Sequence, residues 1–130
     1  MRRLPKRQTW HFRARVLQVA HMIENSMSVI ILLLVEDDET LQNLLEIALS
    51  DEGFEVVLAS NGTKAIAELN ADGARFKGLV TDIQLGAGPN GLDVGRRARE
   101  VVSGLPVVYM SGDSAHDMVS ARFGSSVWLT

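Results

Sequence analysis

The sequence predicts a doubly wound α/β domain built on a five-stranded parallel sheet. The first reason is Val29–Val35, an unbroken apolar run rich in Val and Ile, which suits a strand buried on both faces. The second is the pattern that follows, in which short apolar runs alternate with helical patterns of about 10–15 residues, as in successive β-α-β units. A chain of 130 residues is long enough for one such domain.

Each element is expected from its own pattern. The strands are short apolar runs, at Val29–Val35, Glu55–Ala59, Gly78–Thr81, Pro106–Met110 and Ser126–Leu129. The helices carry apolar residues at helical spacing, at Glu39–Ser50, Thr63–Leu69, Gly91–Val102 and Ala115–Arg122. Gly53 ends the first of these helices. Residues 60–62 form a turn and residues 84–90 a loop. The winding stops after the fifth strand, so the fold is expected to lack a final helix.

Composition narrows the function classes. The sequence has no cysteine, which excludes disulfides and thiolate sites, and its histidines (His11, His21 and His116) have no metal-binding spacing. The longest apolar run has far fewer than the roughly 18 residues that span a bilayer, so a cytoplasmic protein without a membrane partner is expected. The acidic globular part argues against nucleic-acid binding.

Residues 1–27 differ in charge from the rest of the chain. They hold six basic residues and one acidic residue, whereas residues 28–130 hold seven basic and fifteen acidic residues. This asymmetry predicts a basic N-terminal extension, 1–27, before a single domain, 28–130. Two interpretations of the extension remain open. Met27 is the natural start and residues 1–26 are not native, or the extension is real and either disordered or helical. A helix would place one apolar stripe on a single face, made of Phe12, Val16, Val19, Ala20 and Ile23.

Polar residues follow three of the predicted strands. Glu36–Asp38 end the first strand, Asp82 the third and Ser111 the fourth. In a flavodoxin-like strand order, 2-1-3-4-5, these ends are neighbours at one edge of the sheet. Clustered carboxylates favour a divalent cation with oxygen ligands, and the set suits phosphoryl transfer to an aspartate. The simpler alternatives are that Asp38 or Glu39 caps a helix, and that Asp82 and Ser111 are turn residues.

With these motifs the sequence resembles the receiver domain of two-component response regulators. The matching stretches are Ile31–Thr40 (ILLLVEDDET), Gly78–Gly95 (GLVTDIQLGAGPNGLDVG) and Leu105–Asp113 (LPVVYMSGD), and the resemblance covers about residues 29–130. It implies a protein that is not an enzyme in its own right, and that receives a phosphoryl group from a histidine kinase or a phosphotransfer protein.

The resemblance also implies roles for particular residues. Asp82 is the phospho-acceptor, and Glu36 and Asp37 are the acidic pair that holds Mg²⁺, Asp37 being the better candidate for a direct ligand. The backbone carbonyl of Gln84 is a further metal ligand. Ser111 is the switch hydroxyl that moves toward the phosphoryl group.

Near its end the sequence departs from the family pattern. Trp128 falls at the switch aromatic, but the Lys-Pro pair of the family's fifth strand would come after Thr130, the last residue, and so would the final helix. We therefore expect a receiver truncated at its C-terminal end. An uncovered helix footprint costs several kcal/mol at about 25 cal/mol per Å². Such a chain is marginally stable, forms a homodimer, or covers the gap with its N-terminal helix.

Three functions are compatible with these features. The favoured one is a stand-alone receiver phosphorylated on Asp82, whose output passes through a protein target that the sequence does not identify. The missing lysine supports a pseudo-receiver, an interaction module without phosphotransfer. Gly86–Gly91 matches G-x-G-x-x-G and suggests a dinucleotide-binding domain. Residues 82–85 separate those glycines from the strand, however, so a flexible glycine-rich loop is the better interpretation.

Overall fold

The computed structural model describes residues 12–18, 29–111 and 126–129, the last four through their backbone alone. The expected fourth helix, Ala115–Arg122, and the side chain of Trp128 lie outside this part of the chain. No helix in the described residues is long and apolar enough to cross a membrane.

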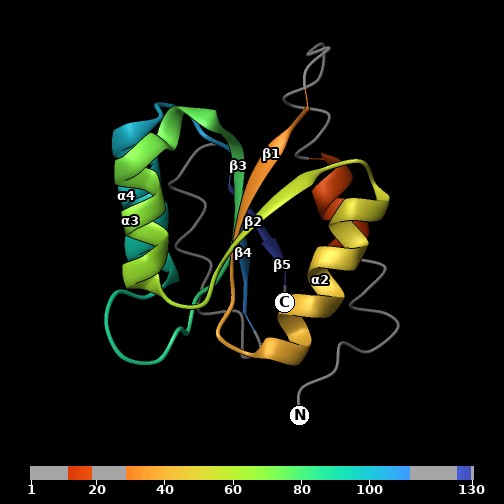
Figure 1. The fold of residues 1–130 in the computed structure, drawn as a ribbon, viewed down its shortest axis with the longest axis horizontal. Helices are drawn as coiled ribbons and strands as arrows, with labels where there is room; N and C mark the ends of the chain where they lie inside the picture. The colour runs from red at the N-terminus through yellow and green to blue at the C-terminus, as the bar shows by residue number, and fades with distance from the viewer. Residues whose placement is uncertain (1–11, 19–28, 112–125, 130) are drawn as a thin grey trace.

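Five parallel strands form a single sheet (Figure 1). They are β1 (Ile31–Val35), β2 (Glu55–Ala59), β3 (Phe76–Asp82), β4 (Val107–Met110) and β5 (Ser126–Leu129). Their order is β2-β1-β3-β4-β5, and every neighbouring pair is parallel. The predicted strand order is therefore confirmed. No helix follows β5 in the described part of the chain.

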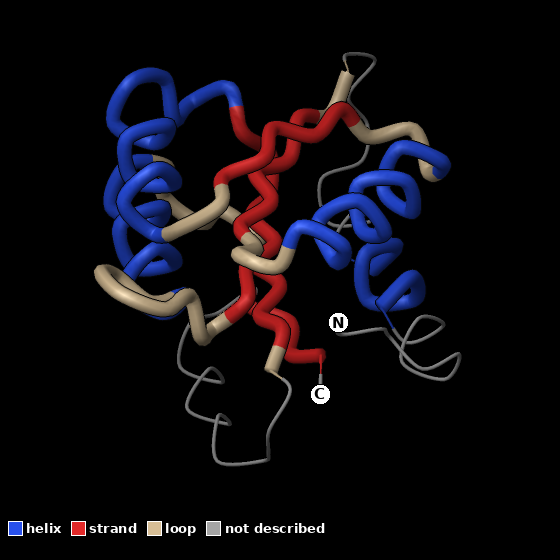
Figure 2. The backbone as a smooth tube through the Cα atoms, turned by 60° about the horizontal axis from the view of Figure 1, so that its bottom comes forward, coloured by secondary structure: helices blue, strands red, loops and turns tan. Residues whose placement is uncertain are grey.

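Helices cover both faces of this sheet (Figure 2). One face carries α2 (Glu39–Asp51), and the other carries α3 (Gly62–Asp72) and α4 (Gly91–Val101) (Figure 1). Each of these helices begins at a side-chain cap, provided by Asp38, Asn61 and Asn90 in turn. Such caps satisfy backbone N–H groups that have no partner within the helix, which explains why the helices begin where they do.

Several boundaries differ from the sequence-based expectation, and three elements differ by two residues or more. The β1 strand begins at Ile31 and not at Val29, which is 61% exposed. The α3 helix runs past Leu69 to Asp72 and continues as the short 3-10 helix η1 (Gly73–Arg75). Its last turn is exposed and carries no apolar periodicity that would reveal a helix. The β3 strand begins at Phe76, two residues before the expected start, because Phe76 is fully buried and pairs with Ile31 of β1.

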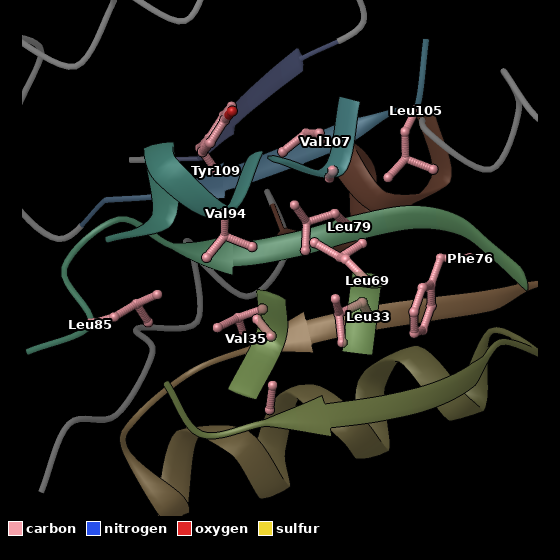
Figure 3. Packing of buried hydrophobic residues seen from close by; sticks show 13 residues of the cluster. Leu33, Val35, Leu69, Phe76, Leu79, Leu85, Val94, Leu105, Val107 and Tyr109 are labelled. Atoms are coloured by element: carbon pink, nitrogen blue, oxygen red, sulfur yellow. The ribbon is translucent and has the colours of Figure 1, made fainter. Parts of the chain in front are cut away.

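Alternate residues of the central strands build two separate cores. Leu32 and Leu34 of β1 pack on the α2 side, whereas Leu33 and Val35 pack on the side of α3 and α4 (Figure 3). Side chains of a strand point to opposite faces in turn, so a continuous apolar run supplies both cores. Leu32–Val35 are all less than 2% exposed, as expected for a strand buried on both faces.

The N-terminal extension contributes a helix over residues 12–18, which lies beside α2 (red in Figure 1). Phe12 and Val16, four residues apart on one helix face, are 1% and 2% exposed and belong to the core on the α2 side. Arg13 pairs with Glu52, the C-cap of α2, at 2.5 Å. The N-terminal helix therefore covers the α2 face, one of the three outcomes expected. The rest of its predicted stripe (Val19, Ala20 and Ile23) lies outside the described residues.

Replacing Phe12 by alanine should lower the free energy of unfolding by about 3 kcal/mol, the usual cost of removing a buried phenylalanine side chain. Urea denaturation followed by circular dichroism measures it. The matched control is Leu17→Ala on the same helix, where the side chain is 44% exposed and a loss of only about 0.5 kcal/mol is expected. Equal losses for the two variants would show that this helix does not contribute to the core.

Candidate functional site

Three acidic side chains meet at the C-terminal edge of the sheet. Glu36 and Asp37 follow β1, and Asp82 is the last residue of the neighbouring strand β3. One ligand atom from each lies within 4.8 Å of the others. Glu36 is fully buried and Asp82 is 4% exposed, whereas Asp37 is open to solvent. The predicted convergence of Glu36, Asp37 and Asp82 is thus present in the structure.

The loop from β1 to α2 holds its acids by hydrogen bonds within the loop. The Glu36 carboxylate accepts from the backbone N–H of Asp38 at 3.0 Å, and the Asp38 carboxylate accepts from the N–H of Leu41 at 3.0 Å. Asp38 is therefore the helix cap that the sequence left undecided between Asp38 and Glu39. The two acids on either side of Asp37 are engaged in shaping the loop, while Asp37 itself faces solvent.

A residue that the sequence analysis missed also shapes this loop. The side-chain amide of Gln42, on the first turn of α2, donates a hydrogen bond to the backbone carbonyl of Glu36. This contact ties the helix to the end of β1 and so fixes the direction in which the Glu36 carboxylate leaves the strand. No sequence signal marks it, because a half-buried glutamine on a helix has many ordinary roles.

Asp82 is held from its own loop and from the next strand. Its Oδ1 accepts from the backbone N–H of Gln84 at 3.3 Å, and the N–H of Ile83 donates to the carbonyl of Met110 at 3.1 Å. The second bond joins the ends of β3 and β4, so Ser111 follows a residue that lies directly beside Asp82 in the sheet. Asp82 and Ser111 are therefore at neighbouring strand ends, as predicted.

The strand leading to Ser111 is fixed by a buried tyrosine. Tyr109 is 1% exposed and faces the core on the side of α3 and α4 (Figure 3). A Cβ on Gly95 of α4 would lie 2.1 Å from its hydroxyl oxygen, so that helix position has room for glycine alone. Burial raises the pKa of the Tyr109 hydroxyl, and the nearby positive charge of Arg99 opposes that rise. The hydroxyl therefore stays protonated over the ordinary pH range.

The loop after Asp82 is anchored at both of its ends. Leu85 is 3% exposed and packs in the core on the side of α3 and α4 (Figure 3). At the other end, the Asn90 side chain accepts from the N–H of Asp93 at 2.9 Å, and the Asp93 carboxylate accepts from the N–H of Asn90 at 3.0 Å. The N–H of Gly91 donates to the Ile83 carbonyl at 2.8 Å.

These bonds also argue against a dinucleotide site at residues 86–91. A pyrophosphate would need free backbone N–H groups at the start of the following helix. In α4 the N–H groups of Gly91 and Asp93 already bond to Ile83 and Asn90. The glycine motif therefore closes a turn and begins a capped helix instead of forming a phosphate cradle.

Gln84, Ser111 and Trp128 are the other residues predicted to belong to the site. Gln84 is exposed and its N–H contacts Asp82, and Ser111 is half-buried. Trp128 pairs with Tyr109 through the backbones of β5 and β4. The assignments of the Gln84 carbonyl as a metal ligand, Ser111 as the switch hydroxyl and Trp128 as the switch aromatic stay predictions.

The acidic cluster fits a hard divalent cation. All three side chains offer carboxylate oxygens, the ligands that Mg²⁺ and Ca²⁺ prefer, and two of the three are buried. Like charges held this close repel one another, so a bound cation would relieve an unfavourable interaction that the fold itself imposes.

Comparison with known proteins agrees with this geometry. The family described as "Response regulator receiver domain" matches residues 32–127. A solved receiver protein from Sinorhizobium medicae superimposes with a TM-score of 0.73 at 38% identity, covering 80% of this chain and 83% of that one. The chemotaxis protein CheY4 of Vibrio cholerae superimposes with a TM-score of 0.69 at 20% identity, covering 79% of this chain and 87% of that one, which shows a shared fold alone.

Two curated relatives are considerably longer than this chain. The uncharacterized transcriptional regulatory protein YkoG of Bacillus subtilis is 34% identical over 101 residues, which are 76% of this chain and 43% of that protein. The transcriptional regulatory protein TrcR of Mycobacterium tuberculosis is 38% identical over 89 residues, which are 68% of this chain and 34% of that protein. The chain thus spans less than half the length of these relatives.

Mg²⁺ should stabilise the protein through the acidic cluster, by about 1.4 kcal/mol at a concentration ten times the dissociation constant. Asp82→Asn should abolish this effect. In EDTA the same variant should be more stable than the wild type by about 1–3 kcal/mol, because it removes a repulsive charge at short range. Thermal and urea denaturation with and without Mg²⁺ measure both effects.

The control for this experiment is Asp72→Asn, which removes an exposed carboxylate at the end of α3. It should change neither the stability in EDTA nor the response to Mg²⁺. A response to Mg²⁺ that survives in Asp82→Asn would place the cation elsewhere on the protein.

Proposed function

Because the chain belongs to the response regulator receiver domain family, we propose that it accepts a phosphoryl group on Asp82 from a phosphohistidine. The donor would be a histidine kinase or a phosphotransfer protein of a phosphorelay. The observation that carries this proposal is the position of the Asp82 carboxylate, which ends β3 in a cluster with Glu36 and Asp37.

The proposed reaction is a simple displacement at phosphorus. A carboxylate oxygen of Asp82 forms a bond to the phosphorus atom, the phosphorus–nitrogen bond of the donor breaks, and the imidazole leaves with the electron pair and takes up a proton. Little covalent chemistry is required of the protein beyond placing the nucleophile and neutralising charge. The hydrogen bond from the Gln84 N–H to Oδ1 of Asp82 orients the carboxylate for this attack.

Mg²⁺ is the cofactor that fits this site. When bound, it would neutralise charge on the phosphoryl oxygens. The residues proposed to hold it are Asp37, Asp82 and the backbone carbonyl of Gln84, with Glu36 in support. The exposure of Asp37 favours it as a direct ligand, because its carboxylate can reach a hydrated ion from the solvent side. Glu36 is buried and bonds to the N–H of Asp38, which favours a supporting role.

The Ser111 hydroxyl is proposed to donate a hydrogen bond to a phosphoryl oxygen on Asp82. It follows β4, and the bond from Ile83 to Met110 sets that strand end beside the acceptor. The output step is proposed to run through another protein. The relatives that are named transcriptional regulatory proteins are longer than this chain, so a stand-alone role without nucleic-acid binding stays a prediction.

Incubation with acetyl phosphate and Mg²⁺ should add one phosphoryl group to the protein, because a small-molecule donor needs only the acceptor carboxylate and the metal. Intact-mass spectrometry measures the gain. Asp82→Ala should show none, whereas Asp72→Ala, at an exposed acid outside the site, should gain as the wild type does. A wild-type protein that binds Mg²⁺ yet gains no mass would favour the pseudo-receiver instead.

A further inference from the structure

The loop of residues 84–90 leaves the sheet and returns to it at nearly the same point. The N–H of Gly91 donates to the Ile83 carbonyl at 2.8 Å, and a Cβ on Gly91 would lie 2.1 Å from the carbonyl oxygen of Asp82. The two ends of the loop therefore lie close together, and Gly91, the residue that follows the loop, packs against the backbone of the acceptor residue. The position of the loop therefore affects the position of Asp82.

The far side of this loop rests on the first residue of α3. A Cβ on Gly62 would lie 2.2 Å from the carbonyl oxygen of Pro89 and 2.9 Å from the Cβ of Pro89. These partners are the backbone and the rigid ring of a proline, so they cannot move aside as the tip of a flexible side chain can. Gly62 is buried, and only a residue without a Cβ fits there while the loop keeps its place.

The start of α3 is itself held rigidly. The Asn61 side chain caps the helix by accepting from the N–H of Lys64 at 2.8 Å, and the N–H of Ala65 donates to the Asn61 carbonyl at 3.0 Å. Pro89 thus rests on a fixed surface. The same loop supplies the N–H of Gln84 that bonds to Oδ1 of Asp82, so the contact at Gly62 sets the geometry at the acceptor.

We propose that Gly62 is a positioning residue for the metal and acceptor site. Pro89 packs against the first turn of α3. This contact holds the loop in place, so that the oxygen ligands of Gln84 and Asp82 face the same cation. The inference rests on the proposed function, because it assumes that the cation binds at the acidic cluster. Substitution of a residue that orients the metal ligands without binding the metal itself typically lowers the metal affinity by about 10–100-fold.

The test is Gly62→Ala, compared with Gly73→Ala as the matched control. Gly73 lies at the other end of α3, where an added Cβ would be 2.4 Å from the side chain of Val101, so both variants crowd a buried glycine. Three quantities are measured: the dissociation constant of Mg²⁺ by calorimetry, amide hydrogen exchange at residues 84–88 without metal, and the rate of phosphorylation by acetyl phosphate at saturating Mg²⁺.

We expect Gly62→Ala to weaken Mg²⁺ binding about tenfold and to speed exchange in the loop, with a smaller change in the rate at saturating Mg²⁺. Gly73→Ala should leave Mg²⁺ affinity and loop exchange unchanged, even where it lowers the melting temperature. An unchanged dissociation constant in Gly62→Ala, or an equal change in Gly73→Ala, would overturn the proposal.

A second pair of variants tests the same contact from the loop. Pro89→Gly removes the ring, whose Cβ packs against Gly62, and frees the backbone at that position, whereas Ala87→Gly adds a glycine at an exposed position of the same loop. Pro89→Gly should weaken Mg²⁺ binding and speed loop exchange more than Ala87→Gly does, and equal effects would overturn the proposal. This pair decides the matter if Gly62→Ala fails to fold.

The two proposals fail in different ways. If the wild-type protein binds no Mg²⁺, the proposed function is wrong. The contact between Gly62 and Pro89 would then still be judged by hydrogen exchange in the metal-free protein, where equal exchange in Gly62→Ala and the wild type would overturn it.

Discussion

The parallel pairing of β1 with both β2 and β3 is the constraint on which the rest of this structure depends. It places Leu32–Val35 inside the sheet, where helices bury both faces, and it brings the carboxyl ends of β1 and β3 to one edge. Glu36 is therefore buried beside Asp82 although these carboxylates repel each other. The hydrophobic free energy of the two cores holds the acids together. The site is thus a consequence of how the strands pair, and its local hydrogen bonds refine it.

The features that depend on local pattern could be predicted from the sequence. The apolar run before Glu36 predicted β1, and the acids at successive strand ends predicted that Asp37 and Asp82 would meet. The last turn of α3, the early start of β3 and the contact of Pro89 with Gly62 were not predictable. The start of β3 and the contact of Pro89 with Gly62 depend on packing between segments far apart in the chain, which leaves no periodic mark. The last turn of α3 is exposed and so carries no apolar pattern either. Glycine permits both a free loop and a tightly packed one, so the glycines at 86–91 do not indicate how firmly the ends of this loop are held.

The helix at residues 12–18 joins the basic extension to the acidic domain through two different interactions. Phe12 and Val16 add apolar area to the core on the α2 side, and Arg13 pairs with Glu52 at the C-terminal end of α2. The ion pair is partly exposed and contributes little to stability, so it helps to set the position of the helix, while the burial of Phe12 supplies the energy. The same core contains Met110, the residue before Ser111, so the extension packs in the core that supports one of the strand ends at the site.

The packing of Pro89 against Gly62 also limits how the length of the loop at residues 84–90 can vary. Pro89 packs against the start of α3 and Gly91 is bonded to the end of β3, and earlier in the loop Leu85 is buried in the core. A residue added or removed between Leu85 and Pro89 cannot be absorbed by sliding, because each end is held by a different element. Surface loops usually tolerate insertions. Here the distance between the core position of Leu85 and the start of α3 determines how many residues the loop can contain.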